Sequence, residues 1–154
     1  MKSAGVPFTE TVRSRRAEYE RELRRRHVPR VLLSDGTEPE AVAEIRPTDD
    51  GSMHGTAASA GAVTAQATVV LDPHQARLEP GRILVCPSTD PGWTPLFLTA
   101  GGLVMEMGGS NSHGAVVARE YGIPAVVGVP DATARLRTGQ TVTVDGAAGT
   151  VVSA

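Results

Sequence analysis

Apolar and polar residues alternate in short blocks from residue 55 to the C-terminus, and each block has the length of a strand or a short helix. Blocks rich in Val, Leu and Ile, bounded by Gly, Pro, Asp and Ser, are typical of buried strands. They occur at 67–71, 82–86, 103–107, 125–127, 141–144 and 150–152. Helices are expected between them, at 93–100, 113–121 and 131–136. The pattern predicts a layered α/β or α+β domain that closes with a hairpin at Asp145-Gly146.

The first 27 residues follow a different pattern, that of one amphipathic helix. No Gly or Pro interrupts the segment from Thr9 to Arg26, and the helix is expected to stop before Val28-Pro29. Four apolar side chains recur within a narrow arc at the helical period: Phe8, Val12, Tyr19 and Leu23. This apolar stripe fits two roles, docking on the chain's own domain or docking on an acidic partner protein.

Three parts of the chain are therefore expected. Residues 1–27 form a basic helical arm, and residues 28–54, rich in Asp, Glu, Gly and Pro, form a connector. Residues 55–154 form the compact domain. A chain of 154 residues has room for one domain with a core and an appendage, but not for two full-sized domains.

Charge and composition narrow the class of protein. Residues 1–27 hold eight Lys/Arg against four Glu, about +4, whereas residues 28–154 hold seven against 13 acidic residues, about −6. Because the basic residues of the arm are interleaved with Glu, neither nucleic acid nor a membrane is the expected partner.

The cellular compartment is expected to be the cytoplasm. The single Cys86 excludes an internal disulfide and a multi-cysteine zinc site, which suits a reducing compartment. No apolar run approaches the length of a membrane span, and residues 1–16 lack the apolar segment of a secretory signal.

One polar, glycine-rich turn, GGSNSHGAVVAREYGIPAVVG at 108–128, brings a histidine to the start of an apolar helix. Gly108 and Gly109 allow a tight turn, His113 begins the helix, and Gly122 ends it after Tyr121. The unpaired N–H groups at a helix N-terminus attract anions and favour a neutral imidazole over imidazolium. A neutral ring nitrogen is a nucleophile, and the same site would then hold the phosphoryl group that the ring acquired. The turn therefore indicates covalent phosphohistidine chemistry.

Other interpretations of the same turn stay open at this point. A histidine at a helix start is commonly a plain polar residue bonded to a loop carbonyl. Metal binding is disfavoured, because Val116 and Val117 occupy the positions where a second ligand would stand. Phosphate binding without covalent chemistry is possible, although the turn lacks the lysine of a Walker loop and the GxGxxG spacing.

Two blocks of sequence resemble a known family. GGSNSHGAVVAREYGIPAVVGV, and the block Thr89-Asp90-Pro91-Gly92-Trp93-Thr94-Pro95-Leu96, are similar to the mobile, swivelling phosphohistidine domain of PEP-utilising enzymes. The second block, and RRAEYERELRRRHVPRVLLSDG before the domain, most resemble the rifampin phosphotransferase branch, which is related to phosphoenolpyruvate synthase-like dikinases. The resemblance implies a three-layer β/β/α swivelling domain.

The resemblance also implies roles for individual residues. His113 is expected to be the catalytic phosphoryl acceptor. The residues expected to bind phosphate are Gly109, Ser110, Ser112 and Gly114, although Ser112 serves equally well as a plain N-cap. Thr89, Asp90 and Arg119 are possible pocket residues. Arg119 lies on a different helix face from His113, so a surface or interface contact is its simpler role.

For function, the resemblance implies a phosphotransferase component. The chain is expected to be a free-standing phosphohistidine carrier that accepts a phosphoryl group from an ATP-grasp partner and passes it to an acceptor-binding protein. ATP or phosphoenolpyruvate, with Mg²⁺, is expected on the partner, and no cofactor or metal on this chain. The alternative is a noncatalytic small subunit or scaffold that covers a partner's active site, as in aconitase-like dehydratases. A carrier requires an exposed, unpaired nitrogen on the ring of His113.

Overall fold

The computed structural model describes residues 8–25, 34 and 51–154. The chain divides into two units, Met1–Glu44 and Ile45–Ala154. Of the connector expected at 28–54, only Ser34 and residues 51–54 are described. Among the described residues, no helix combines the length and the apolar character needed to cross a bilayer.

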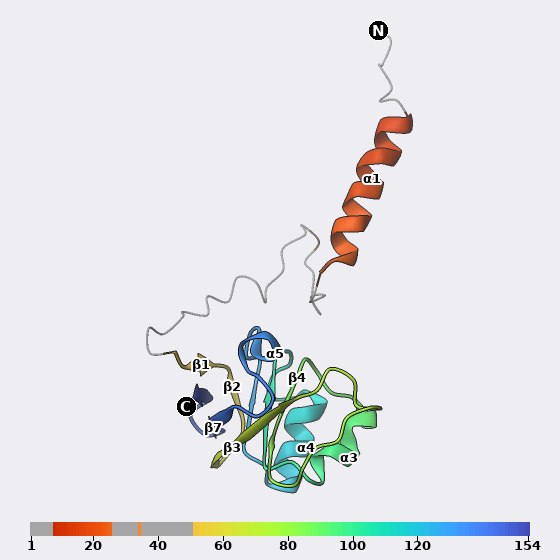
Figure 1. Ribbon diagram of the computed structural model, residues 1–154. Coiled ribbons are helices and arrows are strands. Elements are labelled where there is room, and N and C mark those ends of the chain that lie inside the picture. The colour runs from red at the N-terminus through yellow and green to blue at the C-terminus, as the bar shows by residue number, and fades with distance from the viewer. Residues whose placement is uncertain (1–7, 26–33, 35–50) are drawn as a thin grey trace. The chain divides into compact units, whose positions relative to one another are not determined.

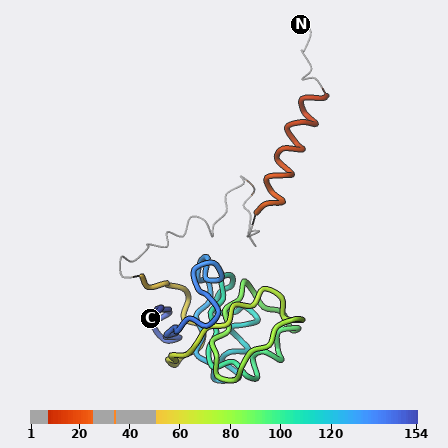
Figure 2. Tube along the Cα trace, in the orientation of Figure 1, coloured from red at the N-terminus to blue at the C-terminus, as the bar shows by residue number. Residues whose placement is uncertain are grey.

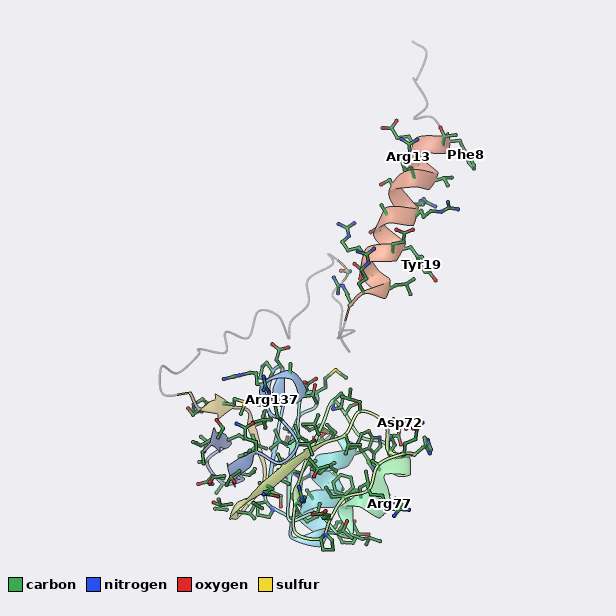
Figure 3. All side chains as sticks on the ribbon, viewed as in Figure 1. Phe8, Arg13, Tyr19, Asp72, Arg77 and Arg137 are labelled. Carbon is green, nitrogen blue, oxygen red and sulfur yellow. The ribbon has the colours of Figure 1, made fainter. Side chains whose placement is uncertain are left out.

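Helix α1, Phe8–Leu23, is the described element of the first unit and confirms the predicted helix. Phe8 and Tyr19 are 11 positions apart, about three turns, and project from the same side of the helix (Figure 3). Both are exposed, at 85% and 64% of their surface. The apolar stripe is thus present on α1, while its docking partner remains a prediction.

The second unit is a mixed domain built on one eight-stranded sheet, in the order β1-β8-β7-β3-β4-β5-β6-β2. Its strands are β1 (Met53–His54), β2 (Thr56–Ser59), β3 (Ala62–Val69), β4 (Ile83–Cys86), β5 (Gly102–Met105), β6 (Ala125–Val127), β7 (Thr141–Asp145) and β8 (Thr150–Ser153). Its helices are the 3-10 turn η1 (Pro91–Trp93), α3 (Thr94–Phe97), α4 (His113–Tyr121) and α5 (Ala132–Arg135).

Strands β3, β4, β5 and β6 run parallel to one another and form the centre of the sheet. Cys86, the last residue of β4, pairs with Met105, the last of β5, and Met105 pairs with Val127, the last of β6. The carboxyl ends of these three strands are therefore level. The loops that follow them all start from the same edge of the sheet.

Side chains of the central strands alternate between two hydrophobic cores, as the pleat of a strand requires. Leu84, Leu103 and Met105 join the core that includes residues of α3 and α4. Val85 and Val104 join the core on the other face, with residues of β7, β8 and α5. Full burial of each such side chain contributes about 1.5–3 kcal/mol. The result is three layers, helices, parallel strands and antiparallel strands, which confirms the predicted fold class (Figure 1).

The sheet curls back on itself because its two edge strands are neighbours in sequence. Gly55 alone separates β1 from β2, yet β1 pairs with β8 and β2 pairs with β6. The N–H of Gly55 donates to the carbonyl of Gly149, at 2.9 Å, across this seam. Figure 2 shows the C-terminal segment beside the yellow β1–β2 segment. The sheet is thus a nearly closed barrel.

Several elements differ from those predicted. Strands β1 and β2 were not expected, because MH and TAAS carry little apolar signal and are ordered by pairing with distant strands. Strand β3 begins at Ala62, not at residue 67, since its first half is largely exposed. The helix expected at 93–100 is instead the turn η1 followed by α3, and ends at Phe97.

A substitution in the β7–β8 turn tests the seam of the barrel. A Cβ at Gly146 would lie 1.8 Å from the carbonyl oxygen of Ser59 and 2.7 Å from the amide nitrogen of Ala125. We expect Gly146→Ala to lower the free energy of unfolding by at least about 1–3 kcal/mol, the usual cost of overpacking, in a urea titration. The exposed neighbour provides the control, since Ala147→Ser should change stability little. An unchanged stability of Gly146→Ala would show that β2 does not pack against this turn.

Candidate functional site

A turn joins β5 to α4, and one position of this turn, residue 108, accommodates only glycine. Gly108 has a φ of +118°, and a Cβ there would lie 2.8 Å from the Ser112 hydroxyl oxygen and 2.8 Å from the Met105 methyl carbon. Gly109, by contrast, has nothing within 4 Å of its Cβ position. Gly108 therefore brings the chain back on itself so that α4 begins at His113, above the carboxyl end of β5.

Ser112 is the N-cap residue of α4, but its side chain does not cap the helix. Its backbone is extended, with φ −67° and ψ 157°, and its carbonyl accepts from the N–H of Val116 at 3.0 Å. Its hydroxyl donates to the carbonyl of Gly109, at 2.8 Å, instead of accepting from the first turn of the helix. The N–H groups of that turn have no partner within the helix and no cap from Ser112, which leaves them available to an anion.

The ring of His113 is half-buried at the start of α4. Its Nε2 atom is buried and has no hydrogen-bond partner among the described residues. The nitrogen is thus unpaired, but the expectation that it is exposed is wrong for Nε2. Nε2 is buried because the first turn of α4 packs closely on the sheet, where the next residues, Gly114 and Ala115, are also buried. An unsatisfied buried polar atom costs about 1–3 kcal/mol, so such an atom in a native protein calls for an explanation, of which a catalytic role is one.

Thr89, in the loop after β4, lies against the first turn of α4. Its hydroxyl donates to the sulfur of Met105 at 3.7 Å, and a Cβ at Gly114 would lie 2.7 Å from the same hydroxyl oxygen. Gly114 thus allows the loop after β4 to approach the helix closely. Asp90, the next residue, is exposed and accepts from the N–H of Gly92 at 2.7 Å, which caps η1.

The other predicted site residues are placed as follows. Gly109 and Ser110 are exposed in the turn before His113. Arg119 lies six residues along α4 from His113, about 9 Å in axial rise. Its guanidinium donates to the carbonyl of Ala58 in β2, at 2.9 Å. The structure therefore shows Arg119 tying α4 to β2 and does not bring it to the ring.

Sequence reasoning missed Glu106, whose side chain links the end of β5 to α5. It directly follows β5 and is buried, with 8% of its surface exposed. One of its carboxylate oxygens accepts from both the N–H and the hydroxyl of Thr133 in α5. This contact connects the residue after β5 to α5. The available signal was a lone acidic residue inside the apolar run LVMEM.

Cys86 is a core residue and not a second nucleophile. It is fully buried at the end of β4. Burial, and to a lesser extent the nearby Glu106 carboxylate, raises the pKa of the Cys86 thiol far above its usual range. The thiol stays protonated at neutral pH and therefore lacks the reactive thiolate form. Among the described residues, no group of three His, Cys, Asp or Glu could hold a metal ion.

Comparison with known proteins agrees with this geometry. Residues 78–149 match the family model of the PEP-utilising enzyme, mobile domain. The rifampicin phosphotransferase of Streptomyces sviceus is 50% identical over 121 residues, 79% of this chain and 14% of that protein. The phosphoenolpyruvate synthase of Aeropyrum pernix is 43% identical over 110 residues, 70% of this chain and 13% of that protein. The chain thus spans about one seventh of the length of these relatives.

A solved structure supports the fold. Aconitase X of Thermococcus kodakaraensis, in its holo-form, aligns with a TM-score of 0.53 at 19% identity, and covers 67% of this chain and 98% of its own. Through residues 78–149, the chain belongs to the mobile-domain family of the PEP-utilising enzymes and is a phosphotransfer domain.

Proposed function

We propose that His113 carries a phosphoryl group between a donor site and an acceptor site that both lie outside residues 51–154. A neutral ring nitrogen attacks the donor's phosphorus, a P–N bond forms, and the donor's P–O bond breaks to release the leaving group. An acceptor oxygen then attacks the same phosphorus, and the P–N bond breaks. The observation that carries the proposal is the unpaired Nε2 of His113 at the N-terminus of α4.

The phosphoryl group would be held by the start of α4 and the turn before it. The N–H groups of Gly114 and the following residue belong to the uncapped first turn, and the hydroxyl of Ser112 is held away from them by its bond to Gly109. Gly109 and Ser110 are exposed beside that turn and complete the proposed phosphate contacts. Backbone N–H groups suit this task, because they stabilise negative charge without carrying a charge themselves.

The buried position of Nε2 sets a further condition. A donor phosphorus cannot reach an atom that solvent does not reach, so transfer to Nε2 requires the imidazole to rotate outward first. Thr89 and Gly114 pack beside the first turn of the helix, and Thr89 is the proposed pocket residue closest to this movement. Phosphorylation would then relieve the cost of the unpaired buried nitrogen.

The partners we propose are those that the resemblance to the PEP-utilising enzymes implies. The donor is an ATP-grasp protein that binds ATP, or phosphoenolpyruvate, together with Mg²⁺, and a separate protein binds the acceptor. The chain would act on them as a separate subunit in the cytoplasm. The exposed apolar stripe of α1, with Phe8 and Tyr19, supports a docking role, because a separate carrier lacks the high effective concentration of a tethered domain.

The alternative is a noncatalytic subunit that covers a partner's active site. The observation behind this alternative is the structural similarity to aconitase X, which extends over 98% of that chain. At 19% identity, the similarity shows a shared fold only. The two proposals differ at His113. Replacing it would abolish the function of a carrier and leave the partner-dependent activity of a scaffold unchanged.

Chemical phosphorylation tests the nucleophile without any partner. Phosphoramidate transfers its phosphoryl group to a histidine nitrogen and releases ammonia. We expect the full chain to acquire a phosphoryl group that is labile in acid and stable in base, seen by mass spectrometry and ³¹P NMR. His113→Ala should lose the label that peptide mapping assigns to residue 113, because that acceptor nitrogen is gone, whereas any label on the three other histidines should persist.

His74→Ala is the matched control for that experiment, since His74 is an exposed histidine in a loop. It should be phosphorylated at His113 as the unmodified chain is. The absence of label at His113 in a folded chain, while His74 is labelled, would contradict the carrier proposal.

The turn before His113 offers a second test. Gly108→Ala places a side chain at a φ of +118° and against Ser112, a strain of about 1–3 kcal/mol, and should slow phosphorylation of His113 by at least about tenfold. Ala147→Ser changes an exposed residue of the β7–β8 turn, outside the proposed phosphate contacts, and should react within about twofold of the unmodified chain. Rates are measured with phosphoramidate, and circular dichroism checks that both variants fold. Equal rates for both variants would mean that this turn does not position the histidine.

A further inference from the structure

We propose that a pocket beside the phosphorylation site receives an arginine or lysine side chain of the protein that exchanges a phosphoryl group with His113. The pocket lies between the loops that follow β3 and β4, and its lining includes Leu71, Asp72, Ser88, Asp90 and Trp93. We call it the β3–β4 pocket. The proposal rests on the proposed function, because it concerns the docking of the donor or the acceptor protein.

The pocket lies on the same edge of the sheet as His113. Strands β3, β4 and β5 are adjacent and parallel, so the loops after β3 and β4 stand next to the turn after β5. Thr89, between the lining residues Ser88 and Asp90, contacts the first turn of α4. A protein that brings a phosphoryl group to His113 must approach this edge, and it then covers the pocket as well.

The size of the pocket indicates a single side chain. Its volume is about 270 Å³. Pockets that hold drug-sized ligands and cofactors measure about 300–1,000 Å³, so this one lies below that range. One long side chain from a docked protein is an occupant of suitable size.

The lining suits a side chain with an apolar stem and a positive end. Leu71 is apolar yet 69% exposed at the pocket, and Trp93 is buried, with 4% of its surface exposed. Asp72 accepts from the N–H of His74 at 2.9 Å, and Asp90 accepts from the N–H of Gly92 at 2.7 Å. These turns hold both carboxylates in place, and the lining contains no Lys or Arg. Methylene groups pack on apolar residues while the guanidinium or ammonium meets the carboxylates.

The charge of the partner supports the same occupant. Sites that bind ATP or a transferring phosphoryl group are rich in Arg and Lys, so the rim around such a site is positive. The loops around the β3–β4 pocket present Asp72 and Asp90 to that rim. The region around α5 carries charges of both signs, on the exposed residues Asp131, Arg135 and Arg137. Figure 3 shows Arg137 well apart from Asp72. Arg77 lies in the same loop as Asp72, five residues along the chain, but is not among the residues that line the pocket.

Binding of a model side chain tests the pocket by itself. The probe is N-acetylarginine methylamide, titrated at low salt into the ¹⁵N-labelled full chain. We expect saturable shifts of the Trp93 indole N–H and of backbone N–H groups at 71–72 and 88–92. The double variant Asp72→Asn/Asp90→Asn should bind at least about tenfold more weakly, because two charge-assisted contacts are lost while the amide oxygens still accept both turn hydrogen bonds.

Asp145→Asn is the matched control. Asp145 also accepts from turn N–H groups, those of Ala147 and Ala148, in the β7–β8 turn and outside the pocket lining. This variant should bind the probe as the unmodified chain does. Equal binding by the double variant, or equal shifts with the uncharged N-acetylcitrulline methylamide, would overturn the proposal. The same shifts with Mg²⁺ alone, and none with the arginine probe, would replace it with a cation site.

The outcome for the pocket is separable from that for His113. Phosphoramidate needs no docking, so the single variant Asp72→Asn, at a position outside the predicted histidine site, should be phosphorylated at His113 at the rate of the unmodified chain. Loss of probe binding with normal phosphorylation supports the pocket. A chain that is phosphorylated normally but never binds the probe overturns the pocket alone, whereas a chain that is not phosphorylated contradicts the proposed function.

Discussion

The register of the parallel strands is the constraint on which the site depends. Cys86, Met105 and Val127 pair as the last residues of β4, β5 and β6, which makes the carboxyl ends of these strands level. A shift of one residue would exchange the two faces of a strand and move Leu103 and Met105 out of the helix-side core. Because these strand ends are level, the turn with His113, the loop with Thr89 and the loop that leads to α5 all start from one edge of the sheet. Glu106 holds α5 at this edge through Thr133.

Local backbone chemistry then sets the position of the histidine. Gly108 reverses the chain at a φ of +118°, and the Ser112 hydroxyl bonds to Gly109 instead of capping α4. The helix therefore begins with uncapped N–H groups and an unpaired Nε2 on His113. In a domain whose net stability is about 5–15 kcal/mol, a buried ring nitrogen without a partner is a considerable cost. Under the proposed function, a phosphoryl group on the ring would bond to that nitrogen and accept from the N–H groups at the start of α4.

Much of the domain was predictable from sequence because it rests on local signals. The apolar runs of β4, β5 and β6 and the helix between Ser112 and Gly122 carry their periodicity and their caps in the sequence. Strands β1 and β2 were not predictable in this way, since they become ordered by pairing with β8 and β6 far along the chain.

The place of His113 at the start of a helix was predictable from sequence, and its surroundings were less so. His113 followed from its place after the glycine turn, but the burial of Nε2 depends on how closely α4 packs, through Gly114, against Thr89 and Met105. The role of Glu106 depends on Thr133, 27 residues away, and no local pattern shows that contact. Long-range packing is the information that the sequence pattern lacks.

The most direct test of the central claim is a ¹H–¹⁵N NMR spectrum of the phosphorylated full chain. If the start of α4 holds the phosphoryl group, the N–H signals of Gly114 and Ala115 shift downfield on phosphorylation and return when acid removes the group. If the ring signals of His113 change while both N–H signals stay in place, the helix N-terminus does not hold the phosphoryl group and the account is wrong.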